Sequence, residues 1–430
     1  MSGRKFPWGR TFVVGFGFLG ISLIWPIFNQ YIPIFLQAGN KEFEAQLLAE
    51  GRKIPAIVGF GLTPALALFI MTWDNIINIF IQPWVGARSD RTWNRFGRRK
   101  GWILLGVPVA ALSFIFIPVA QSVLAIMVFI LITNFGMSLF RSPTVSWLGD
   151  LFESSERSKA NGVINLMGGV GGLLAYFVGG LLFNSLGRSA PFIAGSVAMV
   201  VAIIVALIYV KEPPKIEQAE PKEKTSFIQN ILVVVRNPDR SGLFVLVGIL
   251  FWFMAFNALE TGLSSFAVFT LGIEPGSASI YAAMVTVSFI AFSVPSGLIA
   301  DRIGRKRTIQ IGLTGLTLLF IAGYFIIQNV ASFLVVLFVV GFFWALVNVN
   351  SLPLVYDNGD ERKIGAYTGL YYLSSQLAAV LGPTLGGVMV DVLGDQYRWL
   401  FIFSTVFMAL AWIVMTRVKD RPVVRLAAEK

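Results

Sequence analysis

The sequence predicts an all-α membrane protein of twelve transmembrane helices, arranged as two repeats of six helices each. Only 13% of the 430 residues are charged and 56% are hydrophobic, whereas about a quarter of a soluble domain is charged. Apolar runs of 18 residues or more, the length that crosses the roughly 30 Å of a bilayer core as a helix, recur along the chain. A Gly-x-x-x-Asp-Arg loop occurs twice, 211 residues apart.

The apolar runs define the expected helices in order. They are 11–37, 62–88, 102–120, 123–147, 162–184, 190–210, 241–270, 278–300, 308–328, 332–356, 364–390 and 397–417. Short loops join them, apart from an outside segment at 38–61 and a polar stretch at 211–240.

The stretch at 211–240 begins Lys-Glu-Pro-Pro and is too polar to bury a core, so it is predicted to be a cytoplasmic linker. It divides the chain into a first six-helix half at 1–210 and a second at 241–430. Because the two halves share their loop motifs, we expect the chain to be a duplication.

The basic residues set the predicted orientation. If the N-terminus is cytoplasmic, 28 of the 34 Lys and Arg lie in cytoplasmic segments, 5 lie outside and Arg141 lies within a helix. This bias is the positive-inside rule, so the net charge of +11 indicates topology and no nucleic-acid partner. We therefore predict a monomeric multi-pass protein of the cell membrane, with both termini cytoplasmic and the first helix retained.

The residue types that are missing narrow the function. The chain has no His and no Cys, which removes disulfides, thiol nucleophiles, imidazole relays and soft-metal sites. No convergent nucleophile and base are evident, so we expect neither an enzyme nor a bound cofactor or metal. Without a phosphate-binding Gly-x-x-x-x-Gly-Lys loop, an ion gradient or the solute's own gradient is the expected energy source.

The repeated loops combine acidic and basic side chains in a tight cytoplasmic turn. In the first half they are Gly86, Asp90, Arg91 and Arg98, with Asp150 at the end of the fourth helix; in the second they are Gly297, Asp301 and Arg302. Such an Asp can accept hydrogen bonds from a helix N-terminus or an Arg fork, and we expect the contact to break when the halves move.

These loops resemble the signature of the major facilitator superfamily, and the likeness in helix count, linker and repeat spans nearly the whole chain. The resemblance implies a proton-driven or facilitative carrier of small solutes that works by alternating access. The segment from Gln82 through Pro83 to Lys100, with Pro143 and Asp150, is similar to the glycoside-pentoside-hexuronide group and its plant sucrose-transporter relatives.

Polar side chains within the predicted membrane helices are the candidate site. Asp74 lies 16 residues before Asp90, about 24 Å along the helix and near mid-membrane, where a charged group costs roughly 2.5–3.5 kcal/mol. Asn78 and Gln82 continue the same stripe, and Asn134 on the fourth helix lies at a similar depth. A structural hydrogen-bonding role for Asp74 stays open beside proton coupling.

Other candidates are weaker one by one. Arg141 is expected to anchor the charge of Asp74 or bind solute oxygens, or else to reach the inner interface. The remaining candidates for solute binding are Trp25, Asn29, Asn257, Glu260, Asn348, Tyr372 and Gln376. Sugars are bound by such neutral donors and acceptors beside aromatic rings, although amides also join membrane helices to one another.

The likeness to sugar carriers is incomplete where ions are coupled. The acids that bind sodium in some glycoside carriers fall at Asn78, Gln82 and near Arg141, and the helix-four aspartate of the plant sucrose carriers falls at Asn134. We therefore predict proton-coupled symport of a sugar or glycoside, with Asp74 as the coupling acid. The alternatives are a sugar uniporter and an exporter of amphipathic compounds.

Overall fold

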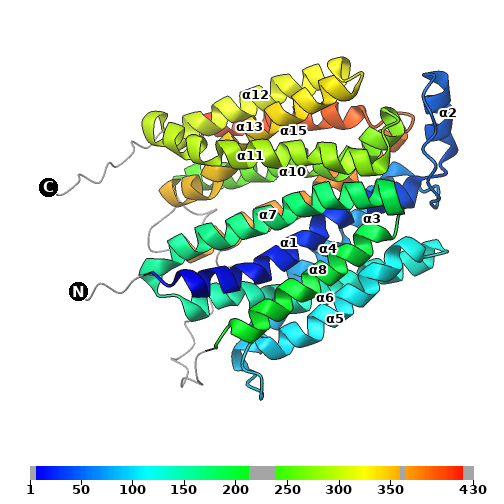
Figure 1. The fold of residues 1–430 in the computed structure, drawn as a ribbon. Coiled ribbons are helices and arrows are strands. Elements are labelled where there is room, and N and C mark those ends of the chain that lie inside the picture. Colours follow the sequence, from blue (N-terminus) through cyan, green and yellow to red (C-terminus); the bar gives the residue numbers. More distant parts are fainter. Residues whose placement is uncertain (1–5, 213–238, 359–363, 420–430) are drawn as a thin grey trace. The chain divides into compact units, whose positions relative to one another are not determined.

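The computed structural model describes residues 6–212, 239–358 and 364–419. Twelve helices or helix pairs in these ranges are long and apolar enough to cross a membrane, which confirms the predicted number and the all-α class (Figure 1). The elements are α1 Trp8–Gln37, α2 Lys41–Ala49, α3 Pro64–Met71, α4 Trp73–Arg91, α5 Lys100–Phe116, η1 Ile117–Val119, α6 Val123–Leu151, α7 Ser154–Leu186, α8 Ala190–Tyr209, α10 Ser241–Ser265, η2 Phe266–Thr270, α11 Pro275–Ile303, α12 Arg305–Ile326, α13 Val330–Asn358, α14 Ile364–Val392 and α15 Trp399–Thr416.

The chain forms two compact units, which are described separately. Unit 1 comprises Met1–Ala219 and Leu263–Ala283, and unit 2 comprises Glu220–Gly262 and Met284–Lys430. The predicted division at the 211–240 linker stays a prediction, because most of that linker lies outside the described residues. In each unit, the basic end is the end of the helices that carries residues 91–100 or 301–307, and the other is the opposite end.

Helix α1 is the centre of unit 1. It packs along α7 and α8, while α6 packs on α4 and α5. The backbones of α1 and α7 approach closely at Gly171 of α7, where a Cβ would stand 2.7 Å from the carbonyl oxygen of Leu19. Membrane helices associate through such small residues because lipid supplies no hydrophobic drive between them.

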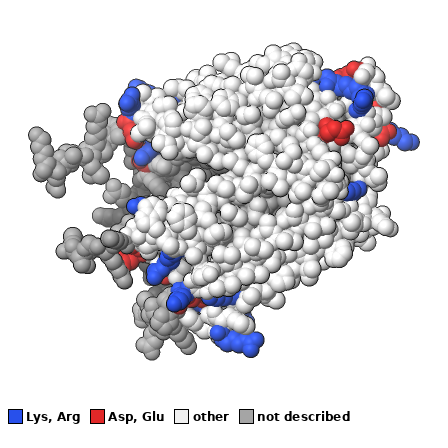
Figure 2. All heavy atoms as spheres, viewed as in Figure 1, with Lys and Arg blue, Asp and Glu red and all other residues white. Residues whose placement is uncertain are grey.

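In unit 2, packing contacts join α12, α13, α14 and α15. Helix α12 packs on α13 and α15, and α14 packs on α13 and α15. Gly382 of α14 permits the matching backbone approach, since a Cβ there would stand 2.4 Å from the carbonyl oxygen of Met254 on α10. Figure 2 shows the charged side chains gathered at the two ends of the visible face, with uncharged surface between them.

Two segments differ from the expected helices. The second span is interrupted at Thr72, between α3 and α4, instead of running continuously over 62–88. The outside segment predicted as a loop contains the short helix α2. Its start is stabilised by Asn40, whose side chain accepts from the backbone N–H of Glu42, and by the acidic first turn.

Candidate functional site

The interruption of the second span places an acid at a helix start within the membrane. Thr72 ends α3 and donates its hydroxyl to the carbonyl of Phe69 at 2.7 Å. Asp74 lies in the first turn of α4, where the exposed backbone N–H groups favour a negative charge. The side-chain amide of Asn75 also donates to Asp74 Oδ1 at 2.8 Å. The helix break thus provides Asp74 with polar neighbours at a depth where lipid provides none.

Arg141 of α6 supplies the opposite charge. Its guanidinium interacts electrostatically with the carboxylate of Asp74. A charge that lacks a counter-charge is costly to hold within a membrane, so the two residues stabilise each other's ionised forms. The structure therefore places the acid and the base, which lie on separate helices, within range of an electrostatic interaction.

Asn78 joins α4 to α6 one turn further towards the basic end. Its Oδ1 accepts from the hydroxyl of Ser138 at 2.6 Å and from Nε2 of Gln82 at 2.8 Å. Asn78 is 7% exposed, so these bonds satisfy an amide oxygen that would otherwise be buried unpaired. Ser138 was not among the predicted residues, although its position four residues after Asn134 is the signal that would have identified it.

Asn134 is the exception in this cluster. It is 2% exposed, and neither its Nδ2 nor its Oδ1 has a hydrogen-bond partner in the structure. Asn134 lies one helical turn before Ser138 on α6, and Asp74 lies one turn before Asn78 on α4. The two helices run in the same direction, and Ser138 bonds Asn78, so Asn134 and Asp74 lie at a similar depth. An unpaired buried amide costs about 1–3 kcal/mol per lost group, which keeps Asn134 a candidate binding residue.

Trp25 and Asn29, two further candidates of unit 1, lie one turn apart on α1. The indole Nε1 of Trp25 is buried without a hydrogen-bond partner, and its ring packs edge-on against Phe28 at 5.7 Å. Asn29 is half-buried. No hydrogen bond joins either residue to the α4 and α6 cluster within the described ranges, so their part in binding stays a prediction.

The basic end of unit 1 holds a network of charges. Asp150 accepts from Nε of Arg99 at 2.8 Å and forms an ion pair with Arg98, while Arg99 also pairs with Asp90 at 2.5 Å. Burial works to lower the pKa of Arg99, but the hydrogen bonds and negative charges of Asp150 and Asp90 outweigh it, so the pKa is raised. Gly86 and Arg91 precede this network on α4.

Glu212, which no sequence argument selected, ties the end of unit 1 to the same turn. Its carboxylate accepts from the backbone N–H groups of Arg99 and Lys100 at 3.0 Å each, and from the indole of Trp147 at 3.0 Å. An acid at this position satisfies the free N–H groups at the start of α5. The Glu-Pro-Pro sequence at 212–214 gave no hint of its partner, because the contact spans more than a hundred residues.

Unit 2 also has an ion pair at its basic end, but it does not involve the Asp301 and Arg302 that the sequence predicted. Asp301 and Arg302 are exposed, and no ion pair to either occurs in the part of the chain that the structure describes. Arg305 instead bonds Asp357 at 2.5 and 2.6 Å. Both residues lie 207 positions after Arg98 and Asp150, so the duplication preserves this pair.

The helices that carry the unit 2 candidates also form an aromatic cluster. Phe256 of α10 stacks on Trp344 of α13 with ring centroids 3.8 Å apart, and Phe253 packs edge-on against Trp344 and Tyr371. Asn348 follows Trp344 by one turn and is half-buried.

Four further candidates lie in unit 2, and they differ in exposure. Tyr372 is exposed, while Gln376, one turn later on α14, has a buried Oε1 without a partner. Glu260 is exposed on α10, and Asn257 precedes it on the same face.

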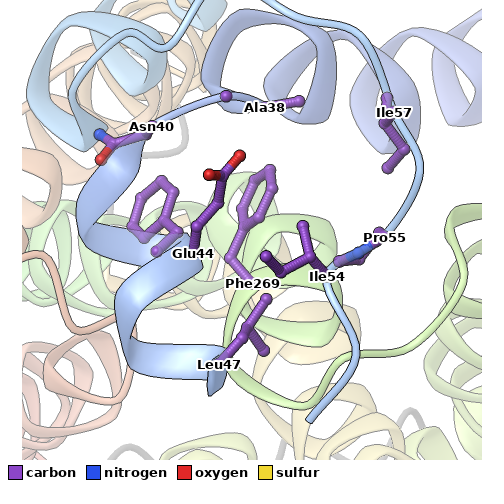
Figure 3. A pocket seen from close by; sticks show the side chains of 10 residues that line it. Ala38, Asn40, Glu44, Leu47, Ile54, Pro55, Ile57 and Phe269 are labelled. Atoms are coloured by element: carbon purple, nitrogen blue, oxygen red, sulfur yellow. The ribbon is translucent and has the colours of Figure 1, made fainter. Parts of the chain in front are cut away.

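At the opposite end of unit 1, α2 closes over η2. Phe43 stacks on Phe269 with centroids 4.7 Å apart and planes 11° apart, and Arg52 donates to the carbonyl of Leu271 at 2.8 Å. A small hollow lies between α2 and η2, and the side chains of Glu44 and Phe269 point into it (Figure 3).

Arg188 contacts the segment between α2 and α3. It donates to the carbonyl of Val58 at 2.8 Å and covers the ring of Phe35 at 4.3 Å; burial lowers its pKa.

Comparison with known proteins agrees with this architecture. The family model of the Major Facilitator Superfamily matches residues 8–285 and 268–430. An uncharacterized MFS-type transporter of Bacillus subtilis, YuxJ, is 27% identical over 84% of this chain and 95% of its own. Lactose permease of Lactobacillus helveticus is 26% identical over 55% of this chain and 39% of its own.

Solved structures share the fold at low identity. The nucleoside transporter NupG matches with a TM-score of 0.67 and 15% identity, covering 96% of this chain and 100% of its own. With twelve spans, duplicated charge pairs and a family match over both halves, the chain belongs to the Major Facilitator Superfamily and is a secondary transporter that works by alternating access.

Proposed function

We propose that this protein carries a sugar or glycoside across the cell membrane together with protons, with both termini in the cytoplasm. The observation that carries the proposal is Asn134, a buried amide with a free donor and a free acceptor on the same helix as Arg141. A sugar offers neighbouring hydroxyl groups, each of which donates and accepts, so one amide binds two of them at once. The lactose permease of Lactobacillus helveticus among the relatives supports this substrate class.

Asp74 and Arg141 provide a means of coupling. While Asp74 is ionised, it holds the guanidinium of Arg141. When Asp74 takes up a proton, Arg141 loses that partner and becomes available to the oxygens of the solute. Proton binding and solute binding would then favour each other, as linkage requires of a symporter.

The test is transport by the purified protein in liposomes. A panel of labelled mono- and disaccharides, glycosides and nucleosides is offered with and without an inward proton gradient. We expect accumulation of one sugar class driven by the gradient. In Asp74→Asn, the gradient should no longer drive accumulation, while exchange of labelled for unlabelled sugar persists. If no sugar enters the vesicles, or if the mutant still accumulates sugar fully, the proposal is wrong.

Export of amphipathic compounds is the second candidate, and the aromatic cluster of unit 2 favours it. Phe253, Phe256, Trp344 and Tyr371 present a surface suited to flat apolar groups rather than to hydroxyls alone. Cationic dyes and detergent-like compounds therefore belong in the same panel. Gradient-driven movement of dyes without movement of sugars would replace the first proposal with this one.

A further inference from the structure

Glu260 of α10 is a carboxylate within a membrane helix, and the described residues of its own unit form no ion pair with it. It lies ten residues before the end of η2, about 15 Å from that end at 1.5 Å per residue. No hydrogen bond or ion pair to Glu260 occurs among the residues that the structure describes. Its side chain is nevertheless exposed, in contrast to its neighbours Ala258 and Leu259, which are buried.

The direction of Glu260 follows from the helical period. At 100° per residue, Glu260, Phe256 and Phe253 lie within about 60° of one another on α10. Phe256 stacks on Trp344, so this face is turned towards α13. Met254 and Ala258, which contact α14, lie roughly 120° or more from Glu260. The carboxylate therefore lies on the side of α10 that carries the aromatic cluster, and away from the face that packs on α14.

The helices packed against α10 offer no base. In the described parts of α13, α14 and α15, Lys and Arg are absent from residues 330–357, 367–392 and 399–416. One turn from Trp344 towards the opposite end, α13 presents Val340, which is buried and apolar.

The charged and titratable groups that these helices do carry are engaged elsewhere or are neutral. Asp357 bonds Arg305 at the basic end of α13, and Arg398, just before α15, donates to the carbonyls of Tyr324 in α12 and of Ile327, which follows α12. On the side of α14 the groups are Tyr371, Tyr372 and Asp391, and Tyr397 precedes α15 next to Gly262. Each of them is an acid or a phenol, so none compensates the charge of Glu260.

The contrast with unit 1 indicates what Glu260 does. Asp74 has a counter-charge in Arg141, whereas an ionised Glu260 within its membrane span would lack a counter-charge among the described residues. A carboxylate in that position is neutralised by binding a proton. We propose that Glu260 is a proton-binding site of the transport cycle, in addition to Asp74; the transport role rests on the proton coupling proposed above.

Infrared spectroscopy tests the proton site without any knowledge of the solute. Purified protein in lipid nanodiscs is titrated through neutral pH, and the C=O stretch of protonated carboxyl groups is recorded. Glu260 is the one Glu within the described membrane spans. We therefore expect a band near neutral pH that shifts when the protein is labelled with 13C-glutamate, is lost in Glu260→Gln and persists in Asp74→Asn.

The matched control is Glu274→Gln, which removes an exposed carboxylate just beyond η2 and should leave the band unchanged. If Glu260→Gln does not fold, the isotope shift in the wild-type protein still decides the question. A band that persists unchanged in Glu260→Gln, or the absence of any glutamate band near neutral pH, overturns the proposal.

A second measurement links the site to transport. In liposomes, the number of protons moved per solute is expected to fall by one in Glu260→Gln and to stay unchanged in Glu274→Gln. An unchanged proton ratio in Glu260→Gln would remove Glu260 from the transport cycle. If the wild-type protein moves no sugar, the proposed cargo fails, but the infrared titration still tests the proton site independently.

Discussion

Arg305 and Asp357 in unit 2 form the same pair as Arg98 and Asp150 in unit 1, displaced by 207 residues along the chain. In both pairs the partners are 52 residues apart. In both, the Asp lies at the end of one membrane helix and the Arg lies near the start of the membrane helix before it. The pairs differ in their surroundings. Asp150 is 14% exposed and shared with Arg99, whereas Asp357 is 36% exposed.

This difference predicts unequal costs for the same substitution. Asp150→Asn leaves Arg99, which is 5% exposed, with a weakened set of partners, and should lower the free energy of unfolding by about 3 kcal/mol. Asp357→Asn removes a solvated pair and should cost about 1 kcal/mol or less. Thermal unfolding in detergent measures both, and equal shifts in midpoint would contradict the role assigned to burial.

The contact of Glu212 with the start of α5 predicts a second effect on stability. Glu212→Ala leaves the backbone N–H groups of Arg99 and Lys100 and the indole of Trp147 without their acceptor. We expect a loss of about 1–2 kcal/mol, as for other helix-capping groups. Glu153→Ala, at the capping box of α7, tests an exposed cap in the same assay and should cost less.

The close approach of α7 and α1 predicts a packing defect at one glycine and none at another. A methyl group at Gly171 would meet the carbonyl of Leu19 at 2.7 Å, so Gly171→Ala should destabilise the protein by about 1–3 kcal/mol. Gly162 on the same helix has open space, and Gly162→Ala should be neutral or stabilising by up to about 1 kcal/mol. Unfolding midpoints that rank the other way would reject the packing of α1 on α7.

The absence of Cys from the chain makes the contact between α2 and η2 testable by cross-linking. Phe43→Cys with Phe269→Cys replaces two stacked rings, and a disulfide or a short thiol cross-linker should join them. Because alternating access requires movement at this end of the helices, we expect the cross-link to stop transport and a reductant to restore it. Leu48→Cys, on the exposed face of α2, should not cross-link to the same partner.

The pairing of Asp74 with Arg141 predicts that their substitutions are not additive. Arg141→Gln leaves an unpaired acid in the membrane, and Asp74→Asn leaves an unpaired base. The double variant removes both charges and should be more stable than the sum of the single effects suggests, by about 0.5–3 kcal/mol. A double-mutant cycle on unfolding midpoints measures this, and exact additivity would show that the two charges do not interact.

Local composition was enough to predict the number, type and approximate limits of the spans. A membrane helix satisfies its own backbone and exposes apolar side chains, so hydropathy along the chain determines it. The duplication could be read for the same reason, because equal spacing of the Gly-x-x-x-Asp-Arg loops needs no tertiary contact. Helix α2 was missed, although Asn40 followed by Glu42 and Glu44 is a helix-start pattern that the sequence does contain.

Only the tertiary structure decided which polar groups meet. Asp74 and Arg141, Asn78 and Ser138, and Glu212 and the start of α5 are joined across 60 or more residues, and their meeting depends on how the helices pack and rotate. The same packing left Asn134 without partners and Glu260 without a counter-charge, which no pattern along the chain distinguishes from satisfied residues. Hydropathy along the chain determines where a helix crosses a membrane, but the packing of neighbouring helices determines which polar groups come into contact.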